Sequence, residues 1–155
     1  MRVNATLCFI MKNNKVILLK KTKGLFGGGK WNAPGGKIKE NESSEEGTVR
    51  EVFEETGLKV KNLEKIGTLN FFKNGQKRKS EWIVDVFLTN EFKGRLKASR
   101  EGKLKWFNAN QLPFDKMWED DTYWYKYILQ KRRFEGNFYF LGDFEKLTEH
   151  EIKVF

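Results

Sequence analysis

The chain has 155 residues, a formal net charge of +9 at pH 7 and a single cysteine, Cys8. This length suffices for one domain whose core needs no disulfide or metal to hold it together. One cysteine excludes an internal disulfide and is typical of the reducing cytoplasm, where we expect this protein. No signal peptide precedes the first strand-like segment and no apolar run is long enough to cross a bilayer, so we expect no membrane partner.

The positive charge is spread over short runs such as 20–21, 77–79 and 131–133. Such runs are usually solvated, although a basic surface can attract nucleic acid or a small polyanion such as a triphosphate. The sequence contains no RNA-recognition or helix-turn-helix signature. We therefore expect a monomer that acts on a small molecule and does not bind nucleic acid stably.

The first predicted elements are two strands, 3–11 and 15–21, joined by a tight turn at Asn13-Asn14. Cys8 lies in the apolar run of the first strand, which indicates a buried small hydrophobic side chain. Residues 24–29 are rich in glycine. They form either a mobile loop at the edge of a site or simply a long turn.

A helix is predicted over residues 43–56, because Ser43 is a good N-cap and Gly57 is typical of the position after a helix. At about 100° per residue, one stripe of this helix can face a core. Its members are Val49, Val52, Phe53 and Thr56.

The second half of the chain is predicted to alternate strands with one further helix. Asn74-Gly75 is a strong hairpin signal between two strands. In the helix, apolar spacing predicts an inner side that consists of Trp124, Tyr127, Ile128 and the alkyl stem of Lys131. The predicted strands are 63–73, 78–88, 103–107, 137–141 and 151–155, and the helix is 121–132. This order predicts an α/β fold with a mixed sheet between helices.

Three glutamates crowd one side of the 43–56 helix. Glu51 and Glu55 are four residues apart and project side by side, and Glu54 flanks them. Such carboxylates repel one another unless a cation lies among them, and Mg²⁺ prefers oxygen ligands of this kind. A solvated helix face is the ordinary alternative. The preceding Gly35-Gly36, which lets the backbone approach a ligand, and Arg50, which can orient a glutamate, favour the metal site.

The spacing of these residues follows a longer pattern, G-x5-E-x7-R-E-U-x-E-E-x-G-U with U aliphatic. The chain matches it at every specified position through Gly36, Glu42, 50–52, 54–55 and 57–58. In this the chain resembles the Nudix family, whose members cleave nucleoside diphosphates linked to another group with the help of Mg²⁺. The resemblance implies an α/β/α sandwich and a single Nudix domain over residues 1–155.

A second stretch narrows the resemblance. Residues 111–124, with Met117-Trp118-Glu119-Asp120-Asp121 at their centre, are similar to the MutT homologues of animals, as are residues 129–136 and Trp31-Asn32. Those enzymes hydrolyse oxidised purine nucleoside triphosphates. The resemblance implies that Trp118 stacks on the purine, that Phe71 lines the same pocket, and that Asp120, Asp121 and Asn32 face the base edge.

The same resemblance implies which residues lie near the sugar, the phosphates and the metal. Thr6 and Lys21 would lie near the sugar and phosphates, and Pro34, Gly35, Gly36 and Lys37 would complete the substrate contacts. The metal, Mg²⁺ with Mn²⁺ as a substitute, would be held by Glu51, Glu54, Glu55, Glu101 and a carbonyl of Gly35 or Gly36. The chain departs from the family at Pro34, where a phenylalanine is expected, and in the 24–29 loop, which is one residue longer.

The implied reaction is attack of water on a phosphorus of the triphosphate, which releases a nucleoside monophosphate and pyrophosphate. A glutamate takes the proton from water. Glu54 is the first candidate and Glu51 the second, with Arg50 as the residue that orients them.

The pair Asp120-Asp121 also carries a prediction about the base. Adjacent carboxyl groups in a half-apolar pocket raise each other's pKa and titrate as a unit. We expect them to share a proton near neutral pH, so that either oxidised guanine or oxidised adenine can be bound. The alternative is that the pair merely caps the helix that begins near Thr122.

Three functions remain consistent with the sequence. The first is an oxidised purine triphosphatase, and the second is a Nudix pyrophosphohydrolase with another substrate, such as unmodified nucleoside triphosphates or ADP-ribose. The third is a non-catalytic nucleotide- or RNA-binding module. The presence of every glutamate of the motif argues against the third.

Overall fold

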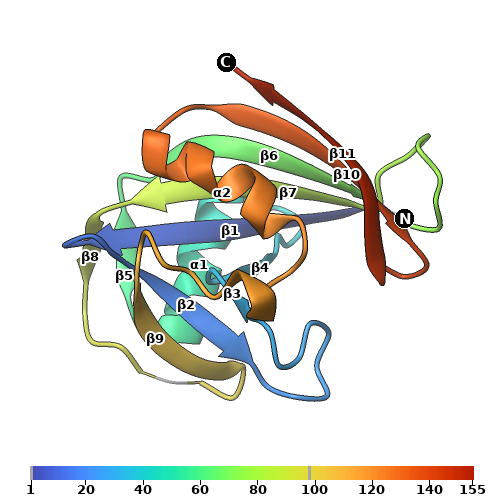
Figure 1. Ribbon diagram of the computed structural model, residues 1–155. Helices are drawn as coiled ribbons and strands as arrows, with labels where there is room; N and C mark the ends of the chain where they lie inside the picture. Colours follow the sequence, from blue (N-terminus) through green and yellow to red (C-terminus); the bar gives the residue numbers. More distant parts are fainter. Residues whose placement is uncertain (1, 98) are drawn as a thin grey trace.

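The computed structural model describes residues 2–97 and 99–155 and consists of a mixed sheet with a helix on each face (Figure 1). Helix α1 (Ser44–Thr56) lies behind the sheet in this view, and helix α2 (Asp121–Gln130) lies in front of it. The predicted α/β/α sandwich is therefore confirmed.

The long strand β1 (Val3–Lys12) is the centre of the sheet. On one side the strands follow in the order β7, β6, β10 and β11, and on the other side β4 pairs with residues 5–7 of β1. The β1–β7 and β6–β10 pairs are parallel, whereas the remaining pairs are antiparallel. These strands are β4 (Gly35–Lys37), β6 (Glu64–Phe72), β7 (Trp82–Thr89), β10 (Phe134–Leu141) and β11 (Lys146–Val154).

The far end of β1 turns into β2 (Lys15–Lys21), which lies between β3 (Trp31–Asn32) and β9 (Gly102–Asn108). A separate two-stranded ladder is formed by β5 (Lys59–Lys61) and β8 (Glu91–Lys93). A short 3-10 helix, Phe114–Lys116, precedes α2. The expected turn at Asn13-Asn14 is confirmed, since both residues have a positive φ.

Alternate residues of the central strands face two different cores. In β1, Phe9 belongs to the core under α2, whereas Cys8 and Ile10 belong to the core under α1. Cys8 is fully buried, as predicted, and burial raises the pKa of its thiol to about 12. In the first core, Trp124 of α2 stacks on Phe134 at 5.7 Å between ring centroids.

The ends of α1 form as the sequence predicts. Ser43 accepts a hydrogen bond from the backbone of Glu46, whose side chain accepts one from the backbone of Ser43. At the other end, Gly57 adopts the left-handed conformation with φ of 79° and donates to the carbonyl of Phe53. The helix therefore begins and ends at capped residues, which fixes the position of its glutamates.

The predicted inner stripes of both helices are partly wrong. Phe53 is 57% exposed, because the buried face of α1 is turned away from it and passes through Val52 and Thr56 to Glu55. In α2, Tyr125 is buried and donates from its hydroxyl to the carbonyl of Ala109 at 2.8 Å. Lys131 lies outside the helix, exposed and in the left-handed conformation that ends it.

The predicted strand 78–88 is wrong at its start, because β7 begins at Trp82. Asn74 and Gly75 do form a turn with positive φ. The chain then continues in a loop, in which the side chain of Gln76 accepts hydrogen bonds from the backbones of Arg78 and Lys79. The two last predicted strands instead start earlier, at the first residues of β10 and β11.

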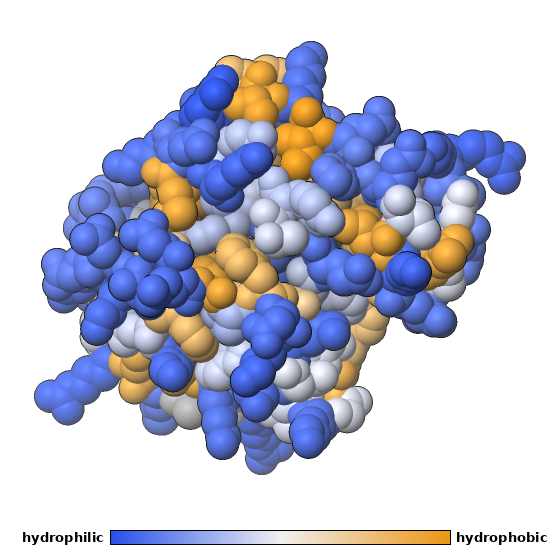
Figure 2. Space-filling model, in the orientation of Figure 1, coloured by the Kyte–Doolittle hydropathy of each residue, from blue (hydrophilic) through white to orange (hydrophobic). Residues whose placement is uncertain are grey.

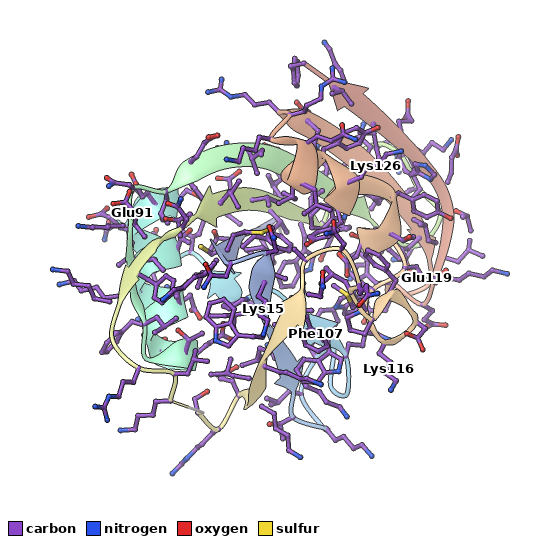
Figure 3. The ribbon with its side chains drawn as sticks, turned by 60° about the vertical axis from the view of Figure 1, so that its left-hand side comes forward. Lys15, Glu91, Phe107, Lys116, Glu119 and Lys126 are labelled. Carbon is purple, nitrogen blue, oxygen red and sulfur yellow. The ribbon has the colours of Figure 1, made fainter. Side chains whose placement is uncertain are left out.

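Polar residues cover most of the face seen in Figure 2, and apolar residues appear on it as separate spots. The basic side chains are spread in the same way. Lys15, Lys116 and Lys126 are exposed and lie on β2, on the 3-10 helix and on α2, in different parts of the molecule (Figure 3). Within residues 2–97 and 99–155, neither helix has the length and apolar character required to cross a membrane.

Candidate active site

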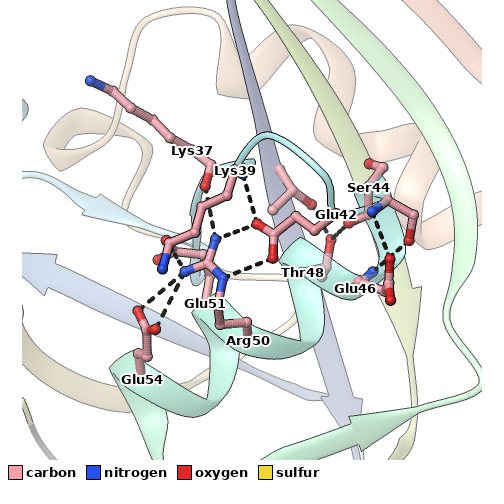
Figure 4. A network of polar contacts seen from close by, with 11 residues as sticks. Lys37, Lys39, Glu42, Ser44, Glu46, Thr48, Arg50, Glu51 and Glu54 are labelled. Atoms are coloured by element: carbon pink, nitrogen blue, oxygen red, sulfur yellow. Dashed lines mark hydrogen bonds and ion pairs between the residues drawn. The ribbon is translucent and has the colours of Figure 1, made fainter.

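The guanidinium of Arg50 lies at the centre of an acidic network on α1 (Figure 4). It donates to Glu42 at 2.6 Å and 3.0 Å, to Glu51 at 2.9 Å and to Glu54 at 3.4 Å, and also to the carbonyl of Lys37 at 3.1 Å. These hydrogen bonds lower the pKa of Glu42 to about 2. Arg50 thus contacts Glu51 on α1 and the carbonyl of Lys37 on β4, and these are the contacts that an orienting role would need.

Glu55 is in a different environment, although it is on the same helix. Its side chain is 3% exposed and accepts a hydrogen bond from the backbone N–H of Gly35 at 2.7 Å. Burial raises the pKa of this carboxyl to about 8, and the nearby charges of Glu51 and Glu101 act in the same direction. Glu55 therefore lies where an added positive charge would be most favourable.

A cavity of about 410 Å³ joins this helix to the aromatic face of the sheet. Its polar end contains Glu51, Glu55 and Glu101 together with Gly35 and Gly36. Its apolar end contains mostly aromatic rings. The residues at that end include Phe26, Phe71, Trp82, Trp118, Phe140 and Phe144.

The apolar end also contains a buried carboxyl pair. Asp120 is 2% exposed and Asp121 is 3% exposed. Asp120 accepts a hydrogen bond from the indole N–H of Trp124 at 2.8 Å, and Asp121 accepts one from the backbone of Trp118 at 3.1 Å. Burial raises the pKa of Asp120 to about 6, and raises that of Asp121 well above its usual range.

The capping explanation for this pair is wrong. Asp120 occupies the N-cap position of α2 but has helical φ and ψ, and its side chain makes no capping hydrogen bond. Both carboxyl groups are instead buried at the wall of the cavity, where Asn32 also lies. Burying two acids costs stability, and carboxyl groups with perturbed pKa values in a cavity are typical of functional sites.

Most of the other predicted site residues border the cavity, but a few do not. Lys21 and Lys37 line its polar end, and the ammonium of Lys21 lies 3.8 Å from Glu101. Thr6 also borders the cavity, yet its hydroxyl is buried and shares a hydrogen bond with Thr48 of α1. The lining does not include Pro34, Arg50 or Glu54. Pro34 is buried, with its carbonyl accepting from Cys8, and the side chain of Glu54 is 52% exposed.

Several lining residues were missed from the sequence, among them Phe26, Trp82 and Lys30. Trp82 had a signal, since it alternates with the core residues Val84 and Val86 on one face of β7. Phe26 lies in the glycine-rich loop, where the sequence suggested only the edge of a site. The structure places this loop at the cavity.

The polar end fits a divalent cation by charge and by donor type. A Cβ on Gly36 would lie 2.5 Å from an oxygen of Glu51, so only glycine allows the backbone to approach this carboxylate so closely. Glu55 and Glu101 add carboxylate oxygens, which suit a hard cation. Across residues 2–97 and 99–155, no three acidic, histidine or cysteine side chains are already gathered into a metal-binding group.

Comparison with known proteins agrees with this arrangement. A family model described as the NUDIX domain matches residues 1–128. The oxidized purine nucleoside triphosphate hydrolase of Danio rerio is 37% identical over 147 residues, covering 95% of this chain and 92% of the zebrafish protein. The protein of the same name from Mus musculus is 38% identical over 135 residues, with 87% and 85% covered.

A crystal structure of the MutT protein from Bacillus halodurans has a TM-score of 0.86 and 33% identity, and the match covers 97% of both chains. The likeness therefore includes β10 and β11, which follow the residues matched by the family model. Because the family model and these relatives span most of the sequence, the chain belongs to the Nudix family of hydrolases, which act on small-molecule nucleotides and generally use a divalent metal.

Proposed function

We propose that this protein hydrolyses oxidised purine nucleoside triphosphates, 8-oxo-dGTP and also 2-oxo-dATP, to the monophosphate and pyrophosphate. The relatives from zebrafish and mouse are named for the hydrolysis of such nucleotides. The observation that carries the proposal is the buried pair Asp120-Asp121, which lines the same cavity as Trp118 and the glutamates of α1. Removal of oxidised nucleotides from the precursor pool would be its role in the cell.

The base end of the cavity supplies the selectivity in this proposal. Oxidation at C8 places a proton on N7, so that this edge of guanine becomes a hydrogen-bond donor beside a carbonyl acceptor. An ionised carboxylate accepts from the donor, and a protonated carboxyl donates to the acceptor. Burial raises the pKa of Asp120 to about 6 and that of Asp121 well above its usual range, which favours a proton held by the pair. Trp118 would stack on the base, with Phe71 and Asn32 beside it.

The polar end would receive the phosphates. Lys21 and Lys37 line this end and supply positive charge, and the backbone of Gly35 and Gly36 permits close approach. Mg²⁺, or Mn²⁺ in its place, would be held by Glu51, Glu54, Glu55, Glu101 and a glycine carbonyl. When bound, it would neutralise charge on the phosphates and make water a stronger acid.

A glutamate of α1 would take the proton from the attacking water. Glu51 borders the cavity and is held by Arg50 at 2.9 Å, whereas Glu54 is outside the lining and more exposed. Glu54 would therefore have to turn inward to act, and Glu51 is already in place. Water attack on a phosphorus would break its bond to the bridging oxygen and release pyrophosphate, with Arg50 keeping the glutamates oriented.

We also propose that residues 1–155 work as one domain, as a monomer in the cytoplasm, without stable binding to nucleic acid.

Product analysis tests the proposed chemistry. The protein is incubated with 8-oxo-dGTP and Mg²⁺, and the nucleotides and phosphates are separated by chromatography. We expect 8-oxo-dGMP and pyrophosphate in equal amounts, loss of turnover after chelation and recovery with Mg²⁺ or Mn²⁺. Release of orthophosphate would contradict the mechanism. Tight binding without turnover would favour the non-catalytic module, and preferential cleavage of ADP-ribose in parallel would favour another Nudix substrate.

A further inference from the structure

The loop 22–30 between β2 and β3 crosses the mouth of the cavity. Its two ends are joined by backbone hydrogen bonds, from Lys21 to the carbonyl of Lys30 at 3.0 Å and from Gly29 to the carbonyl of Lys21 at 2.8 Å. Gly24, Gly27 and Gly29 all have positive φ, so the loop is a series of tight turns. At its tip, Phe26 is 57% exposed.

Phe26 contacts aromatic rings from distant parts of the sequence. Its ring is stacked on Trp82, with 5.9 Å between centroids and 9° between planes, and is tilted against Trp118 at 5.4 Å. Phe144 meets it edge-on at 6.5 Å. Through these three ring contacts, the exposed Phe26 connects the loop to the body of the protein.

The backbone of the loop meets the same wall. A Cβ on Gly27, where φ is 76°, would lie 3.2 Å from the ring of Trp118, and the ammonium of Lys30 lies 5.4 Å from the centre of that ring. Trp82 is the first residue of β7 and is paired with Phe71 of β6, which directs both side chains to the cavity face. Trp118 and Trp82 thus form two walls of the cavity, and Phe26 of the loop contacts both.

We propose that Trp82 is a positioning residue of the base site, which holds Phe26 and thereby keeps the glycine-rich loop closed over a bound purine. The proposal rests on the proposed function, because the ligand it encloses is the purine of the nucleotide. In the closed form the base stacks on Trp118 while Phe26, resting on Trp82, covers its exposed side. The site then excludes water from the edge that Asp120 and Asp121 bind.

The closed loop is also connected to the phosphate end. The ammonium of Lys37 lies 5.7 Å from the centre of the Trp82 ring, and the backbone N–H of Thr22 donates to the carbonyl of Glu101 at 2.8 Å. Loss of Trp82 can therefore weaken substrate binding in two ways, by releasing Phe26 or by displacing Lys37. A double-mutant cycle separates them, because effects that pass through a shared partner do not add.

Trypsin cleavage after Lys23, measured without nucleotide, tests whether the contact between Phe26 and Trp82 holds the loop closed. We call this contact the latch. Cleavage requires the loop to open, so its rate reports the population of the open form. We expect Trp82→Ala and Phe26→Ala to accelerate cleavage by about tenfold, and Trp82→Phe to stay near the wild-type rate, since a ring is retained. Trp106→Phe, whose ring contacts Phe92 outside the cavity, is the matched control. An unchanged rate in Trp82→Ala would overturn the latch.

Steady-state kinetics with 8-oxo-dGTP test whether the contact between Trp82 and Phe26 contributes to substrate binding. We expect Trp82→Ala to raise KM by about tenfold with kcat within about twofold, Trp82→Phe to restore KM, and the Phe26→Ala/Trp82→Ala double variant to resemble either single variant. Additive effects would assign the loss to Lys37 and overturn the proposal. If the wild type does not hydrolyse 8-oxo-dGTP, the proposed function fails, while the trypsin rates still decide whether the latch exists.

Discussion

Asp120 and Asp121 are the residues at which stability and function are in conflict. Both carboxyl groups are buried at the cavity wall, and burial raises the pKa of each. A folded-state pKa above the unfolded value means that the folded protein binds more protons between the two values. The free energy of unfolding therefore falls as pH rises through this window, which for Asp120 runs from 3.8 to about 6.

Asp121→Asn tests this conflict through stability. The amide cannot ionise, and its oxygen can still accept the hydrogen bond from the backbone of Trp118. We expect the free energy of unfolding of the variant to fall less than that of the wild type as pH rises, because the variant lacks the buried carboxyl whose pKa is raised. Urea unfolding at a series of pH values, in the presence of a chelator, measures the free energy of unfolding of both proteins. The same pH dependence in the two proteins would contradict the prediction.

Asp120→Asn tests the shared proton through selectivity. The variant removes one titrating group from the pair and leaves an amide with a fixed donor and acceptor. We expect the ratio of kcat/KM for 8-oxo-dGTP and 2-oxo-dATP to change by about tenfold or more, the size of one charged hydrogen bond. An unchanged ratio would show that the pair does not exchange a proton between the two bases.

Glu51→Gln and Glu54→Gln test which glutamate takes the proton. Glutamine keeps the shape of the side chain and cannot act as a base, so the responsible position should lose about a hundredfold or more in kcat while the nucleotide still binds. Calorimetric titration with substrate, beside the rate, separates binding from turnover. If both variants retain wild-type turnover, the base lies elsewhere, with Glu101 as the next candidate at the polar end.

At the scale of elements, helix α1 is the part that the sequence predicted best. Its capping residues, its length and its line of glutamates follow from local spacing, and each is local information. The inner face was less accurate because burial depends on what packs against the helix. Glu55 is buried by β4, through the hydrogen bond from Gly35, while Phe53 has no such neighbour and stays exposed.

Ser43→Ala tests the contribution of the helix start. The change removes the hydrogen bond that Ser43 accepts from the backbone of Glu46. We expect a loss of about 1 kcal/mol in the free energy of unfolding, and a Tm lower by about 2–4 °C in a chain of this size, with kcat nearly unchanged. Ser43→Thr retains an N-cap oxygen and is the control. A Tm equal to that of the wild type would show that the capping box is not needed.

The errors in the strands have a physical cause as well. Asn74-Gly75 makes the turn that its residue types favour, but the loop then continues to Glu81 because Gln76 supplies hydrogen bonds that a sequence pattern does not reveal. Strands β3 and β4 are too short to show a period, since they have two and three residues. They form because β2 and β1 offer pairing partners.

At the scale of the whole molecule, the site depends on pairings between distant segments. The antiparallel β6–β7 pair places Trp82 opposite Phe71, and the parallel pairs β1–β7 and β6–β10 fix these two strands within the sheet that faces Trp118 across the cavity. No local pattern predicts these parallel pairs, so the aromatic wall was only partly foreseen. The residues implied by the Nudix motif and by the Met117–Asp121 stretch gave both ends of the cavity, and the fold shows that they share one cavity.

The central claim is that the cavity selects an oxidised purine. The most direct measurement is kcat/KM for pyrophosphate release from 8-oxo-dGTP and from dGTP, in parallel, with Mg²⁺ and after chelation. We expect a metal-dependent preference of at least about tenfold for the oxidised nucleotide, because only its base presents a donor at N7 to the carboxyl pair. Equal cleavage of the two nucleotides would retain the Nudix chemistry and contradict the proposed substrate.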